Sequence, residues 1–110
     1  MNFEMITAAA GRLKGHARVT PMLTSPFLDD IAGRRVLVKA ECLQHTGSFK
    51  FRGGWSAVSA LTDNALKTGV IAFSSGNHAQ GVAMACALRG CDHCLRLPPP
   101  PSALLLPRCY

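Results

Sequence analysis

The sequence has few charged residues and no long apolar run. Only 16% of its 110 residues are Asp, Glu, Lys or Arg, whereas 48% are hydrophobic. No apolar stretch approaches the roughly 20 residues that a membrane-spanning helix needs. A chain of this length supports one small domain with a limited core. We therefore expect a soluble globular chain without a membrane partner.

Features of secreted proteins are also missing. The segment that begins at Met1 carries Glu4 where a secretory signal would be basic, and no apolar region with a cleavage site follows. The five cysteines are an odd number, which is typical of reduced thiols and not of a disulfide framework. The sequence therefore predicts a cytoplasmic location.

A dense basic run is lacking too, although the formal net charge is +6. The basic residues occur singly or in pairs such as Arg34-Arg35, with few aromatic residues among them, so nucleic-acid binding is not expected. An excess of positive charge suits the binding of small anions such as phosphates and carboxylates. Two classes stay open at this point: an enzyme for anionic substrates and a small basic binding module without catalysis.

Hydrophobic periodicity predicts alternating helices and strands. Strands that alternate with helices of 10 to 15 residues favour parallel pairing, so we expect an α/β fold with an open, mainly parallel sheet and flanking helices. In such sheets ligands bind beyond the carboxyl ends of the strands. The predicted elements are a helix over residues 3–13, a helical turn over 27–31, a strand over 35–42, a helix over 48–61, a strand over 69–73 that is buried on both faces, and a helix from residue 79 onward.

Two short segments lie between a predicted strand and the helix that follows it. Residues 48–54 read Ser-Phe-Lys-Phe-Arg-Gly-Gly, and residues 74–80 read Ser-Ser-Gly-Asn-His-Ala-Gln. The first offers one lysine, and the second offers small hydrogen-bonding residues at a helix start. Together they present a reactive amine and an anion-binding turn to one ligand.

The lysine of the first segment lies between two aromatic residues. Phe49 and Phe51 would partly desolvate the amine of Lys50, which lowers a lysine pKa and leaves more of the neutral nucleophile. Such an amine can bind an aldehyde covalently. Ser48 suits a helix N-cap. Two alternatives stay open: an ordinary amphipathic helix with a snorkelling lysine, and a serine nucleophile activated through the Ser-x-Lys spacing.

The second segment joins an apolar strand to a helix. Its backbone N–H groups and hydroxyls would converge at the helix N-terminus, where unpaired donors and the helix dipole both favour a carboxylate or a phosphate. The simpler alternative is that Ser75 or Asn77 only caps the helix and that His78 is a solvated residue of the first turn.

A family resemblance becomes specific on these residues. Glu41, four further residues and then Thr-Gly-Ser-Phe-Lys-Phe-Arg-Gly-Gly, ending at Gly54, resemble the pyridoxal-phosphate attachment site of serine and threonine dehydratases. These are tryptophan-synthase β-like enzymes, also called fold type II. The resemblance implies that pyridoxal 5'-phosphate is the cofactor, that Lys50 holds it covalently, and that Phe49 packs near its ring.

The second segment is also similar to a segment of these dehydratases. The resemblance implies that Asn77 bonds the ring hydroxyl of the cofactor, and that Ser75 acts as acid and base on the face opposite the lysine, as in serine racemases. It also implies that one set of residues binds the substrate carboxylate: Ser74, Ser75, Gly76, Asn77 and His78. No metal is implied.

The activity that the resemblance implies is β-elimination. L-threonine or L-serine would give a 2-oxo acid and ammonia, with Lys50 removing the α-proton. The family also implies a homo-oligomer. A sibling enzyme, either a hydroxyaspartate dehydratase or a serine racemase, is the alternative within the class.

The last twenty residues do not resemble the family. We expect residues 1–90 to be the N-terminal part of a pyridoxal-phosphate dehydratase domain and residues 91–110 to be an unrelated tail, rich in proline and leucine. A Cys-x-x-C spacing within it, Cys91 to Cys94, is weak as a zinc or redox motif. Codons for Cys-Asp-His-Cys-Leu read one base further on encode Ala or Val, Thr or Ile, Thr or Ile, and Ala or Val, which is the apolar strand typical of the family.

We therefore hypothesise that the tail is out of frame relative to a full-length dehydratase gene. The glycine-rich phosphate loop and the group for the pyridine nitrogen, which follow in the family, do not occur in this sequence. We expect the isolated chain to be incomplete and weakly active or inactive.

Overall fold

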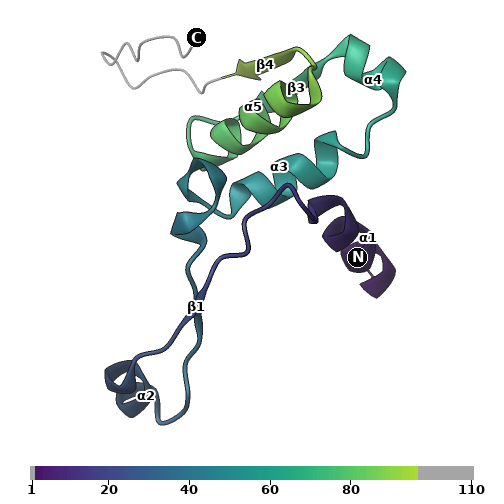
Figure 1. Ribbon diagram of the computed structural model, residues 1–110. Coiled ribbons are helices and arrows are strands. Elements are labelled where there is room, and N and C mark those ends of the chain that lie inside the picture. Colours follow the sequence, from purple (N-terminus) through teal and green to yellow (C-terminus); the bar gives the residue numbers. More distant parts are fainter. Residues whose placement is uncertain (1, 97–110) are drawn as a thin grey trace, which may run out of the picture.

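The computed structural model describes residues 2–96 of the chain. Its body consists of two adjacent helices with a small sheet beside one of them, and a long arm extends from it (Figure 1). The elements in chain order are α1 (Phe3–Leu13), β1 (Met22–Leu23), α2 (Pro26–Ala32), β2 (Val38–Lys39), the 3-10 turns Glu41–Leu43 and His45–Gly47, α3 (Lys50–Val58), α4 (Asp63–Thr68), β3 (Val70–Phe73), α5 (Asn77–Arg89) and β4 (His93–Arg96).

The core lies between α3 and α5. Phe51, which is 0% exposed, packs there with Trp55, and their rings stack with centroids 6.3 Å apart. The remaining buried members of this cluster are Val58, Val82, Ala85, Cys86 and Cys91. Burial raises the pKa of the Cys86 thiol to about 12, and a hydrogen bond with Cys91 acts in the same direction. Both thiols are free.

The sheet beside α5 is parallel, as predicted for an α/β fold. β3 pairs with β4 in a register that joins Val70 to His93 and Phe73 to Arg96. The tail therefore forms a strand at the place where the family has one, although its sequence does not resemble the family's. Only one face of β3 is covered in the described part of the chain, because Ile71 and Phe73 are 67% and 66% exposed. The expectation of a strand buried on both faces is therefore wrong for these residues.

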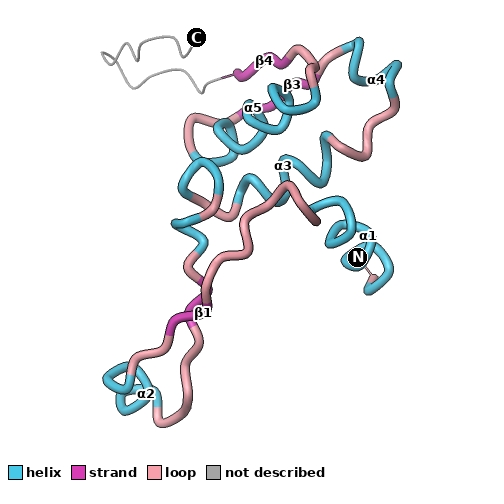
Figure 2. Tube along the Cα trace, in the orientation of Figure 1, coloured by secondary structure: helices cyan, strands magenta, loops and turns pink. Residues whose placement is uncertain are grey.

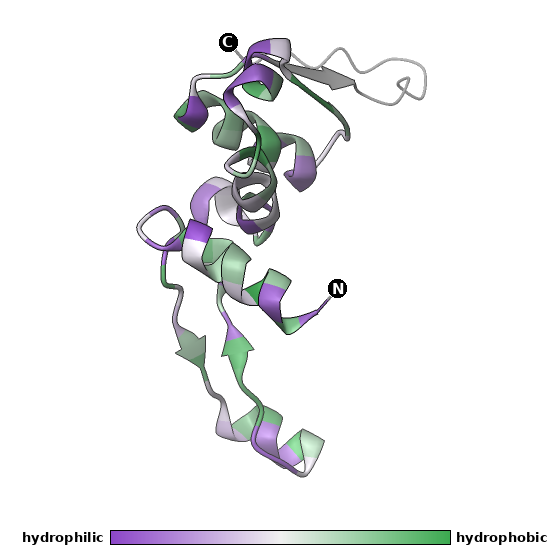
Figure 3. Cartoon of the chain, turned by 90° about the vertical axis from the view of Figure 1, so that its right-hand side faces the viewer, coloured by the Kyte–Doolittle hydropathy of each residue, from purple (hydrophilic) through white to green (hydrophobic). Residues whose placement is uncertain are grey.

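The arm is the second departure from the expected fold. The strand predicted over residues 35–42 is reduced to β2, which pairs antiparallel with β1 and not with the parallel sheet. α2 lies at the far end of this arm (Figure 2), and hydrophobic segments occur in both body and arm (Figure 3). The prolines before β1 and α2 favour extended backbone but do not reveal a pairing partner, which is why the sequence did not show this hairpin.

Helix boundaries follow local capping. α1 has the predicted bounds, and its N-cap Asn2 accepts a hydrogen bond from the Met5 N–H at 3.0 Å. The helix predicted over residues 48–61 is shorter, since α3 begins at Lys50 and ends at Val58. A separate helix, α4, follows because the Thr62 hydroxyl caps it by accepting from the Ala65 N–H at 3.3 Å.

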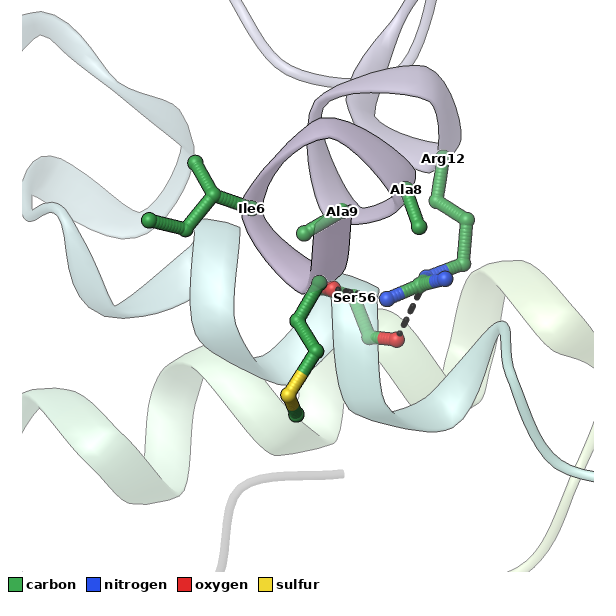
Figure 4. A pocket seen from close by; sticks show the side chains of 6 residues that line it. Ile6, Ala8, Ala9, Arg12 and Ser56 are labelled. Atoms are coloured by element: carbon green, nitrogen blue, oxygen red, sulfur yellow. Dashed lines mark hydrogen bonds between the residues drawn. The ribbon is translucent and has the colours of Figure 1, made fainter. Parts of the chain in front are cut away.

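Contacts from one residue, Arg12, fasten α1 to α3. The Arg12 guanidinium donates to the backbone oxygen and to the hydroxyl of Ser56, both at 3.1 Å (Figure 4). Trp55 Nε1 donates to the Arg12 carbonyl at 2.7 Å, and the His16 ring stacks on Trp55 with centroids 4.0 Å apart. A largely apolar groove of about 460 Å³ runs between the two helices beside these contacts.

An ion pair holds the segment that leads into α3. Arg52 Nε and Nη2 donate to the two carboxylate oxygens of Glu41, each at 2.7 Å, and Arg52 Nη2 also reaches the Arg18 carbonyl at 3.1 Å. This bidentate hydrogen bonding to Arg52 lowers the pKa of Glu41 from 4.5 to about 2. Gln44, which is buried, adds a second clamp by bonding both the N–H and the carbonyl of Arg18 at 2.9 Å.

No helix in residues 2–96 is long and apolar enough to cross a membrane.

The Glu41–Arg52 pair gives a testable pH dependence. Because the pKa of Glu41 is lower in the folded chain, its contribution to stability is complete above about pH 4.5 and is lost as the pH falls through about 2. Glu41→Gln should lower the free energy of unfolding by about 1–3 kcal/mol at pH 7, since a charged hydrogen bond is lost. Denaturant unfolding followed by Trp55 fluorescence at pH 7, 4 and 2 measures the difference.

Asp30→Asn is the matched control, because Asp30 is an exposed carboxylate on α2. Equal effects of the two substitutions at pH 7, or a Glu41→Gln effect that persists undiminished at pH 2, would contradict this account of the pair.

Candidate active site

Lys50 is the first residue of α3. Its side chain is half-buried, and Nζ lies 5.0 Å from the centroid of the Phe49 ring. Phe49 is 58% exposed, whereas Phe51 points into the core and is fully buried. The two aromatic neighbours therefore differ: Phe51 anchors the helix, and Phe49 leaves an open ring beside the amine. Ser48 accepts a long hydrogen bond from the Lys50 N–H, at 3.4 Å.

The segment before this lysine has an unusual backbone. Thr46 has a φ of 59°, a value that β-branched residues rarely adopt, and Gly47 follows with a φ of 69°. The Thr46 hydroxyl is buried without a hydrogen-bond partner. Such strain costs on the order of 1–3 kcal/mol and persists only where surrounding contacts impose it. Here the Gln44 clamp and the Glu41–Arg52 pair lie on the two sides of Thr46.

The second predicted segment joins β3 to α5. Ser74 is half-buried, and its hydroxyl accepts from the Gly76 N–H at 3.2 Å. The residues that follow, Ser75, Gly76, Asn77 and His78, are exposed. Gly76 is the N-cap residue of α5, and no side chain caps this end. Neither Ser75 nor Asn77 therefore serves as the cap, so the first N–H groups of α5 remain available to an external acceptor.

The structure places the two segments at neighbouring helix starts. A Cβ atom built on Gly81, one turn after Asn77, would lie 2.9 Å from the carbonyl carbon of Lys50. The backbone of the lysine therefore lies directly against the second turn of the helix that begins with the 74–78 turn. One ligand at this edge can meet an amine and a set of N–H donors.

Several residues that build this arrangement were not identified from the sequence. Gly81 and the Glu41–Arg52 pair position Lys50, yet each appeared only as part of a longer motif. For the ion pair the signal was two opposite charges eleven residues apart, which does not reveal contact. The strained backbone of Thr46 has no signal in its residue type.

Other candidate sites lie apart from this one. The groove between α1 and α3 is lined by Met5, Ile6, Ala8, Ala9, Arg12 and Ser56, none of which is a predicted site residue. Among the described residues no group of three or more His, Cys, Asp or Glu side chains could hold a metal ion. The side chain of Cys94, the second half of the Cys-x-x-C motif, lies outside the described part of the structure.

Relatives of known activity share this sequence. An L-threo-3-hydroxyaspartate ammonia-lyase of Pseudomonas sp. is 51% identical over 87 residues, which are 79% of this chain and 27% of that protein. The catabolic L-threonine dehydratase TdcB of Escherichia coli K12 is 42% identical over 87 residues, which are 79% of this chain and 26% of the enzyme. The chain thus spans about a quarter of the length of these relatives.

Solved structures share the fold. Maize serine racemase superimposes with a TM-score of 0.83 at 36% identity, over 88% of this chain and 30% of that one. A threonine deaminase from T.th. gives 0.75 at 40% identity, over 88% and 38% of the two chains. These neighbours have the fold-type-II architecture that the sequence predicted.

A family model described as pyridoxal-phosphate dependent enzyme matches residues 13–104, which is most of the chain and includes both predicted segments. With the lysine at the start of α3, the open turn at the start of α5 and relatives at up to 51% identity, this match leads to one conclusion. The chain belongs to the family of pyridoxal-phosphate dependent enzymes of fold type II.

Proposed function

We propose that this chain carries the amine and carboxylate ends of an active site for β-elimination from a 3-hydroxy amino acid. The observation that carries the proposal is the contact between the Lys50 backbone and α5, the helix that begins at the open 74–78 turn. Within the family, both ammonia-lyases and racemases are found among the relatives.

The residues present fit the amine end of pyridoxal phosphate. Lys50 has its amine beside the exposed ring of Phe49, where an aromatic cofactor can stack. Asn77 is exposed at the first position of α5, within one helical turn of Gly81 and hence near Lys50. When bound, the cofactor supplies a ring that accepts the electron pair released at the substrate Cα.

The chain's own residues would divide the remaining work. The N–H groups at the start of α5, with the Ser74 and Ser75 hydroxyls, bind the substrate carboxylate and so orient the Cα–H bond. Lys50 Nζ accepts the proton from Cα. Loss of the β-hydroxyl and hydrolysis then give a 2-oxo acid and ammonia. Ser75 is proposed as the acid and base on the opposite face, the role that would support racemisation.

Two substrate classes follow from different observations. The motifs favour L-threonine or L-serine, and the 42% identity to the catabolic threonine dehydratase supports them. The higher identity to two enzymes named for L-threo-3-hydroxyaspartate, 51% and 49%, favours a substrate with a second carboxylate. As in the family at large, we propose a homo-oligomer in the cytoplasm as the working form.

Lys50 labelling tests the proposal directly. Borohydride reduction after addition of pyridoxal phosphate should place the cofactor on Lys50, and Lys50→Ala should remove at least about nine-tenths of this label, because this amine lies beside both an aromatic ring and an anion-binding turn. Peptide mass spectrometry locates and quantifies the adduct. Lys67→Ala, which removes an exposed lysine on α4, is the matched control. A label spread over all lysines according to their exposure would refute the proposal.

Asn77 gives a second, independent test. Asn77→Ala should weaken pyridoxal-phosphate binding to Lys50 by about 2- to 12-fold, the effect of losing one neutral hydrogen bond. The concentration of pyridoxal phosphate that gives half-maximal label measures this change. Asn64→Ala, at an exposed position of α4, serves as the control. An unchanged half-maximal concentration would remove Asn77 from the proposed site.

The domain boundary near Cys91 is also a proposal. If the tail is out of frame, the coding DNA read one base further on after the Gly90 codon continues with sequence like that of the relatives. The frame-restored protein should then release a 2-oxo acid from L-threonine, L-serine or L-threo-3-hydroxyaspartate, measured by coupled dehydrogenase assay. No family-like sequence in the shifted frame would rule out the frameshift, and no 2-oxo acid from any of the three would rule out the elimination.

A further inference from the structure

α5 passes Lys50 without any side chain between the two backbones. A Cβ atom on Gly81 would lie 2.9 Å from both the carbonyl carbon and oxygen of Lys50, and 3.0 Å from the Phe51 nitrogen. All three are backbone atoms, which cannot rotate away as the end of a flexible side chain can. A residue other than glycine at position 81 therefore requires one helix to move.

The contact is reciprocal. A Cβ atom on Gly54, one turn further along α3, would lie 2.7 Å from the Gly81 oxygen and 2.9 Å from its carbonyl carbon. Gly53, the neighbouring residue on α3, has no atom within 4 Å of such a Cβ. The pair Gly54 and Gly81 thus forms a backbone-to-backbone crossing, whereas Gly53 lies on the open side of the same helix.

The crossing fixes the separation between the two halves of the site. Gly81 is four residues after Asn77, so a displacement of α5 at Gly81 also displaces the 74–78 turn relative to Lys50. Relieving a 2.9 Å approach to ordinary contact at 3.4 Å takes a shift of about half an ångström. Shifts of up to about 1 Å can reduce catalysis on the order of 10²-fold.

We propose that Gly81 is a positioning residue that sets the distance between the Lys50 amine and the carboxylate-binding turn. Gly54 takes part from the other side of the crossing. This inference rests on the proposed function, because it concerns how one ligand reaches both the amine and the turn. It adds a residue that contacts neither cofactor nor substrate and acts through the backbone of Lys50.

The test compares two amines that differ in their carboxylate. L-serine and serinol share the amine and a hydroxyl, but only L-serine can bind the 74–78 turn. In the unsubstituted chain L-serine should release Lys50 from pyridoxal phosphate at a concentration about 10-fold lower than serinol, the effect of a charge-assisted hydrogen bond. Loss of the borohydride-trapped label on Lys50 measures the release.

Gly81→Ala should lower this ratio from about 10 to below about 3, while Lys50 itself is still labelled in the absence of added amine. Gly54→Ala should lower the ratio in the same direction, and Gly53→Ala, the matched control on the open side of α3, should leave it unchanged. An unchanged ratio in Gly81→Ala would overturn the inference.

The ways in which the test can fail are distinguishable. Absence of label on Lys50 in the unsubstituted chain would refute the proposed function itself. Label with a ratio of one would remove the carboxylate site from it, and with it the role of Gly81. Loss of the folded state in both Gly81→Ala and Gly54→Ala, seen by circular dichroism, would assign these glycines to folding and overturn the positioning role.

Discussion

The contact between the backbones of α3 and α5 is the constraint on which the rest of the structure depends. Two glycines, Gly54 and Gly81, allow the helices to approach until a single added methyl group would overlap backbone atoms. This approach brings Phe51 and Trp55 into the same core as Val82 and Cys86. Close packing of this kind leaves little freedom for either helix to shift.

The same contact explains how a small chain can present two functional segments together. Lys50 begins one helix of the pair and the 74–78 turn begins the other, so the geometry of the crossing is also the geometry of the site. Arg52 extends this control backward, because its ion pair with Glu41 holds the strained segment that leads to the lysine. Core packing and site geometry are therefore set by the same few residues of α3.

The sequence predicted local features better than contacts between distant segments. It indicated α1 correctly, the short α2 approximately, and the two turns that precede α3 and α5, because caps, glycines and apolar spacing act within a few residues. The hairpin of β1 and β2 was missed because its strands are two residues each and pair across the α2 arm. At the site, the residue types of Lys50 and Asn77 were informative, whereas the position of Gly81 against Lys50 required three-dimensional contact.

The open face of β3 shows which part of the architecture holds the candidate site together. Parallel sheets are normally covered on both faces, yet Ile71 and Phe73 are exposed here, and each would contribute about 1.5–3 kcal/mol if it were buried. β3 therefore adds little stability of its own beyond its contact with α5. Its role in the described chain is to deliver Ser74 to the start of α5, and the relation of that turn to Lys50 is fixed by the helix crossing. The geometry that the chemistry needs thus resides in the helix pair and not in the sheet.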